Sequence, residues 1–245
     1  MRLNTMKAKR AIIVIILWVF FSFVWFIQNR HFVFQSHLHL SFVETLLLMN
    51  SSAVGYSSIQ AYALFYTIPF LVCLDHFFLS KPICFIVRFA KRRHLYVREF
   101  IEIVIVASVF SFMHTLVNVL WTSYFFSFEQ LQEVNFFSIA LCNGVLLSIF
   151  YTSVGLIHQC FKHLTRQLNV AFFLTLLLVG FWFFIEKLFI FTSWGPMKDL
   201  TMYTQWLENR WTIIEFLFAY IRQALLAFFL FFIYSFLYER KDFIS

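Results

Sequence analysis

Uncharged apolar runs alternate with short polar segments along the whole chain, and this alternation is typical of helices that cross a membrane. A helix needs about 17 to 25 mainly apolar residues to span a bilayer. Runs of this length lie at about 11–27, 59–78, 101–125, 136–156, 170–191 and 212–238. We therefore predict an all-α polytopic membrane protein, with one transmembrane domain over 1–245 and six transmembrane helices.

Composition favours the same fold class. Of the 245 residues, 62% are hydrophobic and only 13% are charged, which excludes an ordinary water-soluble domain. The chain holds 38 Phe but only 5 Gly and 3 Pro, so residues that form turns are scarce. A membrane barrel would instead alternate polar and apolar residues in segments of about ten. Helices are thus favoured over strands.

Basic residues predict the orientation of the spans. With the N-terminus inside, the inner segments hold 14 Lys and Arg and the outer segments hold 3. The positive-inside rule therefore places both termini in the cytoplasm of a multi-pass protein of the plasma membrane. It also explains the net charge of +7 more simply than nucleic-acid binding does. No small-residue cleavage site follows 11–27, so we expect this run to be a retained first span and not a signal peptide.

Cysteine and histidine positions argue against a disulfide or metal framework. The four cysteines are Cys73, Cys84, Cys142 and Cys160, and they form no CxxC pair. His31, His37 and His39 lie close together in the first outer connection. We favour interfacial polar residues over metal ligands here, because no third ligand class or spacing supports a site.

Polar residues within the apolar runs mark surfaces that face other helices. His114 and Asn118 are four residues apart on one face of the third span, where we favour hydrogen bonds between helices over contact with a transported molecule. In the second span, Pro69 predicts a kink. Asp75, near its inner end, is expected to reach the interface or to pair with the basic loop, and a proton relay is the less favoured role.

The last two spans contain the charged residues Glu186, Lys187, Glu215 and Arg222. Glu215 and Arg222 are two helical turns apart on nearly the same face, so they could form a network with Glu186 or Lys187. Arg222 lies deepest and needs a carboxylate partner within the bundle. A structural ion pair and a functional residue at the translocation surface both fit its position.

The fourth span carries a stripe of small residues at strict four-residue spacing, Ala140, Gly144, Ser148 and Thr152. Such a stripe lets another helix approach closely. It predicts helix packing and says nothing of chemistry.

Two outer connections are too apolar to be solvated loops. In 29–58, Ser41 and Glu44 match a capping box, which predicts a short helix over 45–49 lying in the outer interface. In 192–211, three tryptophans and Gly195-Pro196 predict a segment that dips into the same interface.

A basic segment, SKPICFIVRFAKRR over 80–93, lies between the second and third spans. Ser80 and Pro82 suit the first turn of a helix. Its apolar face would hold Ile83, Ile86, Val87 and Ala90, with the cations Arg88, Lys91 and Arg92 largely elsewhere. Such a helix could rest on anionic headgroups or insert its apolar face into a groove on a soluble partner.

The sequence contains no motif for catalysis or for a cofactor. GxxxxGK[ST], HExxH, GxSxG and CxxC are all missing from it. We therefore predict no catalytic, cofactor-binding or metal-binding residue, and we expect any ATP to be hydrolysed by another chain.

Six spans with inside termini, the basic helix SKPICFIVRFAKRR and the aromatic excursion before the sixth span together resemble the permease subunits of type-2 ABC exporters. The resemblance implies that Ile83, Ile86, Val87, Arg88, Ala90, Lys91 and Arg92 couple to a cytoplasmic ABC ATPase. It also implies a second permease copy in a homodimer or heterodimer, surrounded by membrane lipid and without nucleic acid. Small Phe-rich permeases of this kind occur beside peptide-antibiotic or bacteriocin export and immunity systems of Gram-positive bacteria. This implies export of an amphipathic or hydrophobic substrate, such as a peptide, a bacteriocin or a lipid-like molecule.

Two other function classes fit the same pattern. A membrane scaffold that packs beside a larger complex would transport nothing and would have no dedicated ATPase. A proton-coupled secondary carrier would have a charged pair at mid-membrane and internal repeats, and we see no convincing repeat. An adjacent gene with a P-loop would favour the exporter.

Overall fold

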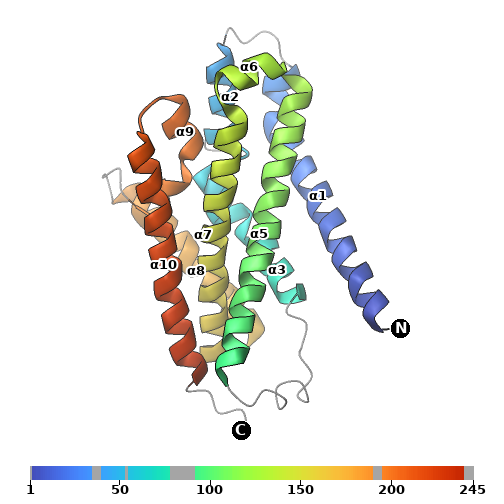
Figure 1. The fold of residues 1–245 in the computed structure, drawn as a ribbon, viewed down its shortest axis with the longest axis vertical. Helices are drawn as coiled ribbons and strands as arrows, with labels where there is room; N and C mark the ends of the chain where they lie inside the picture. The colour runs from blue at the N-terminus through green and yellow to red at the C-terminus, as the bar shows by residue number, and fades with distance from the viewer. Residues whose placement is uncertain (1, 35–39, 53–54, 78–91, 190–194, 240–245) are drawn as a thin grey trace.

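A computed structural model describes residues 2–34, 40–52, 55–77, 92–189 and 195–239, and within these ranges it contains helices and no strand (Figure 1). The long helices are α1 (Arg2–Phe34), α5 (Arg92–Phe125), α7 (Phe136–Thr165), α8 (Leu168–Leu188) and α10 (Ile213–Glu239). The shorter elements are α2 (Phe42–Ser51), the π-helical turn η1 (Ala61–Phe65), α3 (Thr67–Phe77), α6 (Phe128–Glu133), the 3-10 turn η2 (Lys198–Leu200) and α9 (Met202–Leu207). The predicted all-α class is therefore confirmed for the part of the chain that the structure describes.

Five helices in the described ranges are long and apolar enough to cross a membrane, Ile12–Phe34, Leu95–Phe125, Phe136–Thr165, Leu168–Leu188 and Ile213–Glu239. Their outer faces carry large apolar side chains. On α10, Ile214, Leu225 and Phe229 are 64%, 62% and 62% exposed. Each Å² of such surface costs about 25 cal/mol in water, whereas lipid covers it at no such cost. The chain is a multi-pass membrane protein.

The second predicted span, 59–78, is the irregular one. Its apolar helical stretch, Ala61–His76, is shorter than the other five. The Tyr66 N–H donates to the Ala61 carbonyl at 2.8 Å, and the Thr67 hydroxyl donates to the Tyr62 carbonyl at 3.0 Å. Both bonds reach back five residues, which widens the helix just before Pro69, a residue with no N–H to continue the regular ladder. The break expected at Pro69 is thus a π-helical turn immediately preceding it.

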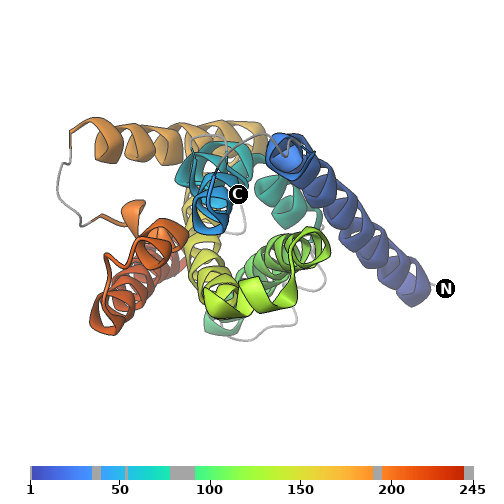
Figure 2. The ribbon, with the colours of Figure 1, turned by 90° about the horizontal axis from the view of Figure 1, so that it is seen from above.

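α7 is the central helix and contacts α5, α8 and α10 (Figure 2). In Figure 1, α1 begins and α10 ends in the lower half of the bundle, where α3 also ends and α5 begins. α2, α6 and α9 gather in the upper half. The two halves therefore differ in kind: one collects the ends of long helices, and the other collects short helices folded over the bundle.

The predicted capping box begins α2. The Ser41 hydroxyl accepts the Glu44 N–H at 3.3 Å, and the Glu44 carboxylate accepts the Ser41 N–H at 2.8 Å. These hydrogen bonds hold the pKa of the Glu44 carboxyl below its ordinary value. Helix formation here is confirmed. However, α2 packs against α1 and α9 and buries Leu46 and Met49, so it is part of the bundle as well as of its surface.

Small residues let α5 and α7 pack closely, as the four-residue spacing on α7 predicts. A Cβ added at Gly144 would lie 2.5 Å from the Thr115 hydroxyl oxygen and 3.3 Å from the Thr115 Cβ. One turn further on, the Ser148 hydroxyl is hydrogen-bonded to that of Ser108 at 2.9 Å. Gly144 and Ser148 therefore form the part of the stripe that faces α5.

Gly144→Ala is expected to lower the thermal unfolding midpoint, because rotation of Thr115 moves its hydroxyl but leaves its Cβ in place, and overpacking costs about 1–3 kcal/mol. The matched control is Gly180→Ala on α8, where a new Cβ would meet only Leu64, at an ordinary 3.4 Å. That change should be neutral or stabilising, since Ala is about 1 kcal/mol better than Gly within a helix. Thermal unfolding of both variants in the same detergent checks this, and equal midpoints would contradict the close approach.

Candidate functional site

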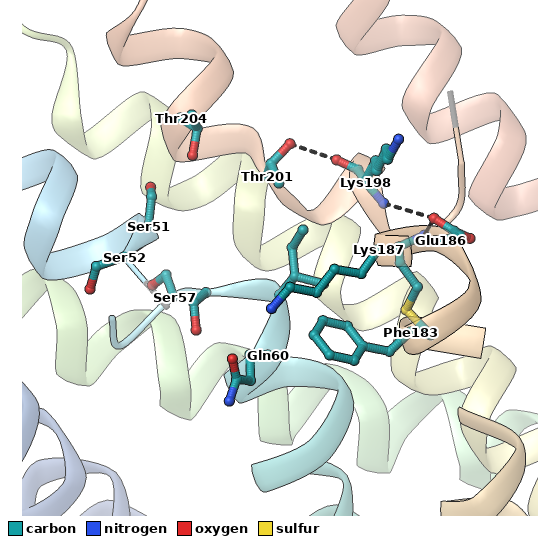
Figure 3. Close-up of a pocket in the computed structure, with 13 residues that line it drawn as sticks. Ser51, Ser52, Ser57, Gln60, Phe183, Glu186, Lys187, Lys198, Thr201 and Thr204 are labelled. Carbon is teal, nitrogen blue, oxygen red and sulfur yellow. Dashed lines mark hydrogen bonds between the residues drawn. The ribbon is translucent and has the colours of Figure 1, made fainter. Parts of the chain in front are cut away.

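A cavity of about 400 Å³, with hydroxyl and charged groups as well as apolar side chains in its wall, lies between the end of α2, the chain that follows it, the end of α8 and the η2–α9 segment (Figure 3). It belongs to the half of the bundle that holds α2 and α9 (Figure 1). Hydroxyl groups line much of it, from Ser51, Ser52, Ser57, Ser58, Thr201 and Thr204. The charged residues in its wall are Glu186, Lys187 and Lys198. This mixture of hydroxyls and charges differs sharply from the apolar surface of the bundle.

A tight turn after α2 brings the serines to the cavity. The Tyr56 N–H donates to the Met49 carbonyl at 2.8 Å, which folds the chain back against the end of the helix. At Gly55, a Cβ would lie 2.8 Å from the backbone carbonyl carbon of Asn50, so glycine is the residue that fits this close approach. Ser51, Ser52, Ser57 and Ser58 thereby form a wall of the cavity.

Glu186 anchors the opposite wall. Its side chain is buried near the end of α8, and its Oε2 accepts the N–H groups of Met197 at 2.9 Å and Lys198 at 3.2 Å. A Cβ at Gly195 would collide with this carboxylate, which explains a glycine there. Sequence alone grouped Glu186 with the charges of α10; in the structure it holds the segment that precedes η2.

The carboxylate partner expected for Arg222 exists, and it is Asp199 of η2. The Arg222 Nε donates to Asp199 Oδ2 at 2.7 Å, and its Nη2 donates to Oδ1, which makes a two-pronged pair. The Gln223 amide next to it donates to the Pro196 carbonyl. The 192–211 connection is therefore fastened to α10, and its Tyr203 is buried in the bundle, which goes further than the predicted dip into the interface.

Glu215, a possible member of a network with Arg222 by its spacing, has a local hydrogen-bond partner instead. Glu215 is exposed in the first turn of α10, and its Oε2 accepts the Thr212 N–H at 2.6 Å and the Thr212 hydroxyl at 3.0 Å. A carboxylate at this position is stabilised by the unpaired N–H groups and the dipole of its own helix. Spacing along α10 placed Glu215 on nearly the same face as Arg222, but it did not reveal Thr212 as the partner of Glu215.

Asn118 makes the expected hydrogen bonds between helices, whereas the partner of His114 is Tyr56 in the turn after α2. Asn118 accepts the Trp25 indole N–H at 3.1 Å, and its amide donates to Asn50 at 2.9 Å and to the Tyr203 hydroxyl at 3.0 Å. It therefore links α1, α5, α2 and α9. Burial raises the pKa of the Tyr203 hydroxyl, so this group stays neutral.

His114 sits one turn from Asn118. Its ring stacks on Tyr56 with centroids 4.3 Å apart, and its Nε2 lies 3.3 Å from the Tyr56 carbonyl. In return, the Tyr56 hydroxyl donates to the His114 carbonyl at 3.1 Å. Both residues are fully buried, so this part of α5 is a structural polar core that adjoins the cavity through Ser57.

A second buried polar cluster lies between α3, α7 and α8. His158 Nε2 is 3.2 Å from the Asp75 carboxylate, and the Lys162 ammonium is 3.4 Å from it. His158 Nδ1 is 3.3 Å from the Thr175 hydroxyl. Asp75 therefore pairs with the end of α7. Sequence analysis expected Asp75 to reach the interface or to pair with the basic loop, whose residues up to 91 lie outside the described ones. It missed His158 because 158 lies on a different helix far along the chain.

The remaining predicted residues fall into two groups. In the stripe, Ala140 is buried among Leu46 and Tyr203, and the Thr152 hydroxyl bonds its own helix at the Ser148 carbonyl. The proposed coupling residues Ile83, Ile86, Val87, Arg88, Ala90 and Lys91, together with Cys84, His37 and His39, lie outside the described residues. Arg92 is the first residue of α5.

Chemically, the cavity is suited to binding. In the described ranges, no group of three His, Cys, Asp or Glu side chains could hold a metal ion, and Cys73, Cys142 and Cys160 are free thiols. Comparison with known protein families, with characterised proteins and with solved structures finds no match to this chain. The function must therefore be inferred from the residues and their arrangement.

Proposed function

We propose that this chain is the transmembrane permease subunit of an export system whose ATP is hydrolysed by a separate ABC-type ATPase. The observation that carries the proposal is a cavity with charged and hydroxyl groups in its wall, in one half of an apolar membrane bundle. A protein that only fills a membrane has no need for such a cavity, whereas a permease needs polar surface that its substrate can reach.

The geometry fits an ATPase that acts on the half of the bundle away from the cavity. α3 ends and α5 begins in the half of the bundle away from α2 and α9, so the basic segment 80–93 connects elements on the side opposite the cavity (Figure 1). The positive-inside rule makes that side cytoplasmic. An ATPase docked there would act through α5, which contacts α7 and carries Asn118 at its far end.

The exposed apolar faces of α8 and α10 fit a two-fold arrangement, in which a second permease copy covers part of them. The substrate in this proposal is an amphipathic or hydrophobic molecule, such as a peptide, a bacteriocin or a lipid-like compound. Both features come from the resemblance to small exporter permeases.

Val87→Asp is expected to reduce co-purification of the ATPase at least tenfold while the permease still inserts in the membrane. Burying an unpaired carboxylate in an apolar groove is costly, and about 1.4 kcal/mol already makes a tenfold difference in affinity. The matched variant replaces Arg88, Lys91 and Arg92 with Ala and should weaken ATPase recovery less. If the triple variant loses the ATPase and Val87→Asp keeps it, the segment adheres to lipid headgroups and the coupling proposal fails.

One observation favours a second candidate, the proton-coupled carrier. The Thr175 hydroxyl has one proton, which it donates to the Ala171 carbonyl at 2.7 Å, so the nearby His158 Nδ1 is placed to donate in turn. His158 Nε2 faces the Asp75 carboxylate at 3.2 Å, so one imidazole ring lies between a carboxylate and a hydroxyl within the helical bundle. Intramembrane groups of this kind serve as proton relays. Transport by the reconstituted chain under a pH gradient, with neither ATPase nor ATP, would distinguish this function from the exporter.

A further inference from the structure

Lys187 occupies a distinctive place at the cavity. It lies in the last turn of α8, where a span of this length meets the headgroup region, and its side chain is exposed. Its ammonium is 5.5 Å from the centre of the Phe183 ring, and Figure 3 shows the side chain extending past that ring toward Ser57 and Gln60. No ion pair involves Lys187 in the described part of the chain. An uncompensated cation thus points along a cavity wall at the membrane interface.

Hydroxyl donors face the same cavity. The hydroxyl oxygens of Ser51 and Ser52 are buried, line the cavity and have no hydrogen-bond partner among the residues that the structure describes. Buried polar groups without partners are rare in folded proteins, and each leaves a donor available to a ligand. Two serine hydroxyls and an ammonium form a donor set that suits the oxygen atoms of an anion.

The acidic residue of the cavity is partly compensated. The Glu186 Oε2 accepts two backbone N–H groups, from Met197 and Lys198, while its Oε1 is buried with no hydrogen-bond partner among the described residues. Counting Glu186, Lys187 and Lys198, the wall carries a net charge of +1. The cavity therefore favours an anionic ligand over a cationic one.

Apolar surface for the rest of such a ligand lies next to the cavity. Phe184 and Leu188 are 49% and 57% exposed on the last turns of α8, beside Lys187. A phosphate held at the cavity would leave acyl chains to run down this face of the helix into the membrane. A free anion would make no use of that surface.

We propose that the cavity binds the phosphate headgroup of an anionic membrane lipid, with Lys187 as its cation and Ser51 and Ser52 as hydroxyl donors. The site requires only that the protein is in a membrane, so it stands whether or not the chain exports a substrate. A lipid bound here would join α8 to the serines at the end of α2.

The test uses the full chain purified in neutral detergent and titrated with phosphatidylglycerol, with phosphatidylcholine of the same acyl chains, and with inorganic phosphate. Bound lipid is counted by native mass spectrometry. We expect phosphatidylglycerol to bind and to withstand millimolar phosphate, and phosphatidylcholine to bind more weakly. Lys187→Gln should weaken phosphatidylglycerol binding about fivefold, the effect of one lysine near an anionic surface, whereas Lys187→Arg should preserve it.

Two further variants separate recognition from general charge. Arg30→Gln removes an exposed cation near the end of α1, outside the cavity, and should leave binding unchanged. The Ser51→Ala, Ser52→Ala double variant keeps every charge and should weaken binding about threefold, since both hydroxyl donors are lost. Equal binding of the two lipids, an equal loss in Arg30→Gln, or displacement of the lipid by inorganic phosphate would each overturn the proposal.

Discussion

Arg222→Leu is expected to destabilise the protein by about 3–5 kcal/mol, the usual result of removing one partner from a buried ion pair. The reason lies with Asp199. Its side chain is completely buried, and without the guanidinium its charge keeps only the Gln223 amide, 3.4 Å away. The segment that carries Asp199 also forms a wall of the cavity through Met197 and Lys198, so binding at the cavity should fall together with stability.

Replacing Asp199 should cost less stability than replacing Arg222. Arg222 retains 27% side-chain exposure, so after Asp199→Asn its cation can still be solvated, and we expect a loss of about 1–2 kcal/mol. The double variant Arg222→Leu, Asp199→Asn removes both charges of the pair and should regain much of the stability lost in Arg222→Leu. Denaturant titration of the four proteins in mixed micelles measures the coupling directly.

Glu215→Gln is the matched control for this cycle. Glu215 lies on the same helix as Arg222, and spacing alone makes it the natural partner, but it is exposed and bonded to Thr212. Its loss should cost no more than about 1 kcal/mol and should add to that of Arg222→Leu without coupling. Strong coupling of Arg222 to Glu215, with none to Asp199, would disprove the assigned pair.

Local patterns in the sequence predicted the features that depend on neighbouring residues. The apolar runs located the five long helices, because burial in lipid requires a fixed length of apolar chain. The Ser41 and Glu44 pair located the start of α2, since a capping box is complete within four residues. The spacing of Gly144 and Ser148 located the face of α7 that meets α5.

Features that join distant parts of the chain could not be found in this way. Asp199 belongs to a connection between spans, and no spacing rule relates it to Arg222, 23 residues later. The pairing of Asp75 with His158 crosses 83 positions and depends on how α3 packs against α7. The cavity likewise needs the ends of α2 and α8 to meet. One signal was present: a deep arginine demands a carboxylate, and the connection that precedes α10 holds two, Asp199 and Glu208.

Asn118→Leu is the second change expected to have a large effect, about 2–4 kcal/mol of lost stability. It would leave the Trp25 indole N–H, the Asn50 side-chain oxygen and the Tyr203 hydroxyl without this partner, all in buried positions. Each orphaned group costs about 1–3 kcal/mol in proteins generally, whereas single hydrogen bonds between membrane helices average about 0.6 kcal/mol. Summed over the three groups, these two figures give an upper and a lower limit, and the expected loss of stability lies between them.

Asn143→Leu provides the matched control, because Asn143 is as buried as Asn118 and undergoes the same change in shape. It donates one hydrogen bond, to the Tyr62 hydroxyl at 2.7 Å, and its own side-chain oxygen has no partner. Leucine there removes an unsatisfied group along with a satisfied one, so the loss should stay near 1 kcal/mol or below. Since Asn118 joins four helices and its Ser57 neighbour lines the cavity, Asn118→Leu should also weaken ligand binding, whereas Asn143→Leu should not. Equal losses of stability in the two variants would show that Asn118 acts as one more buried amide and not as the junction of α1, α2, α5 and α9.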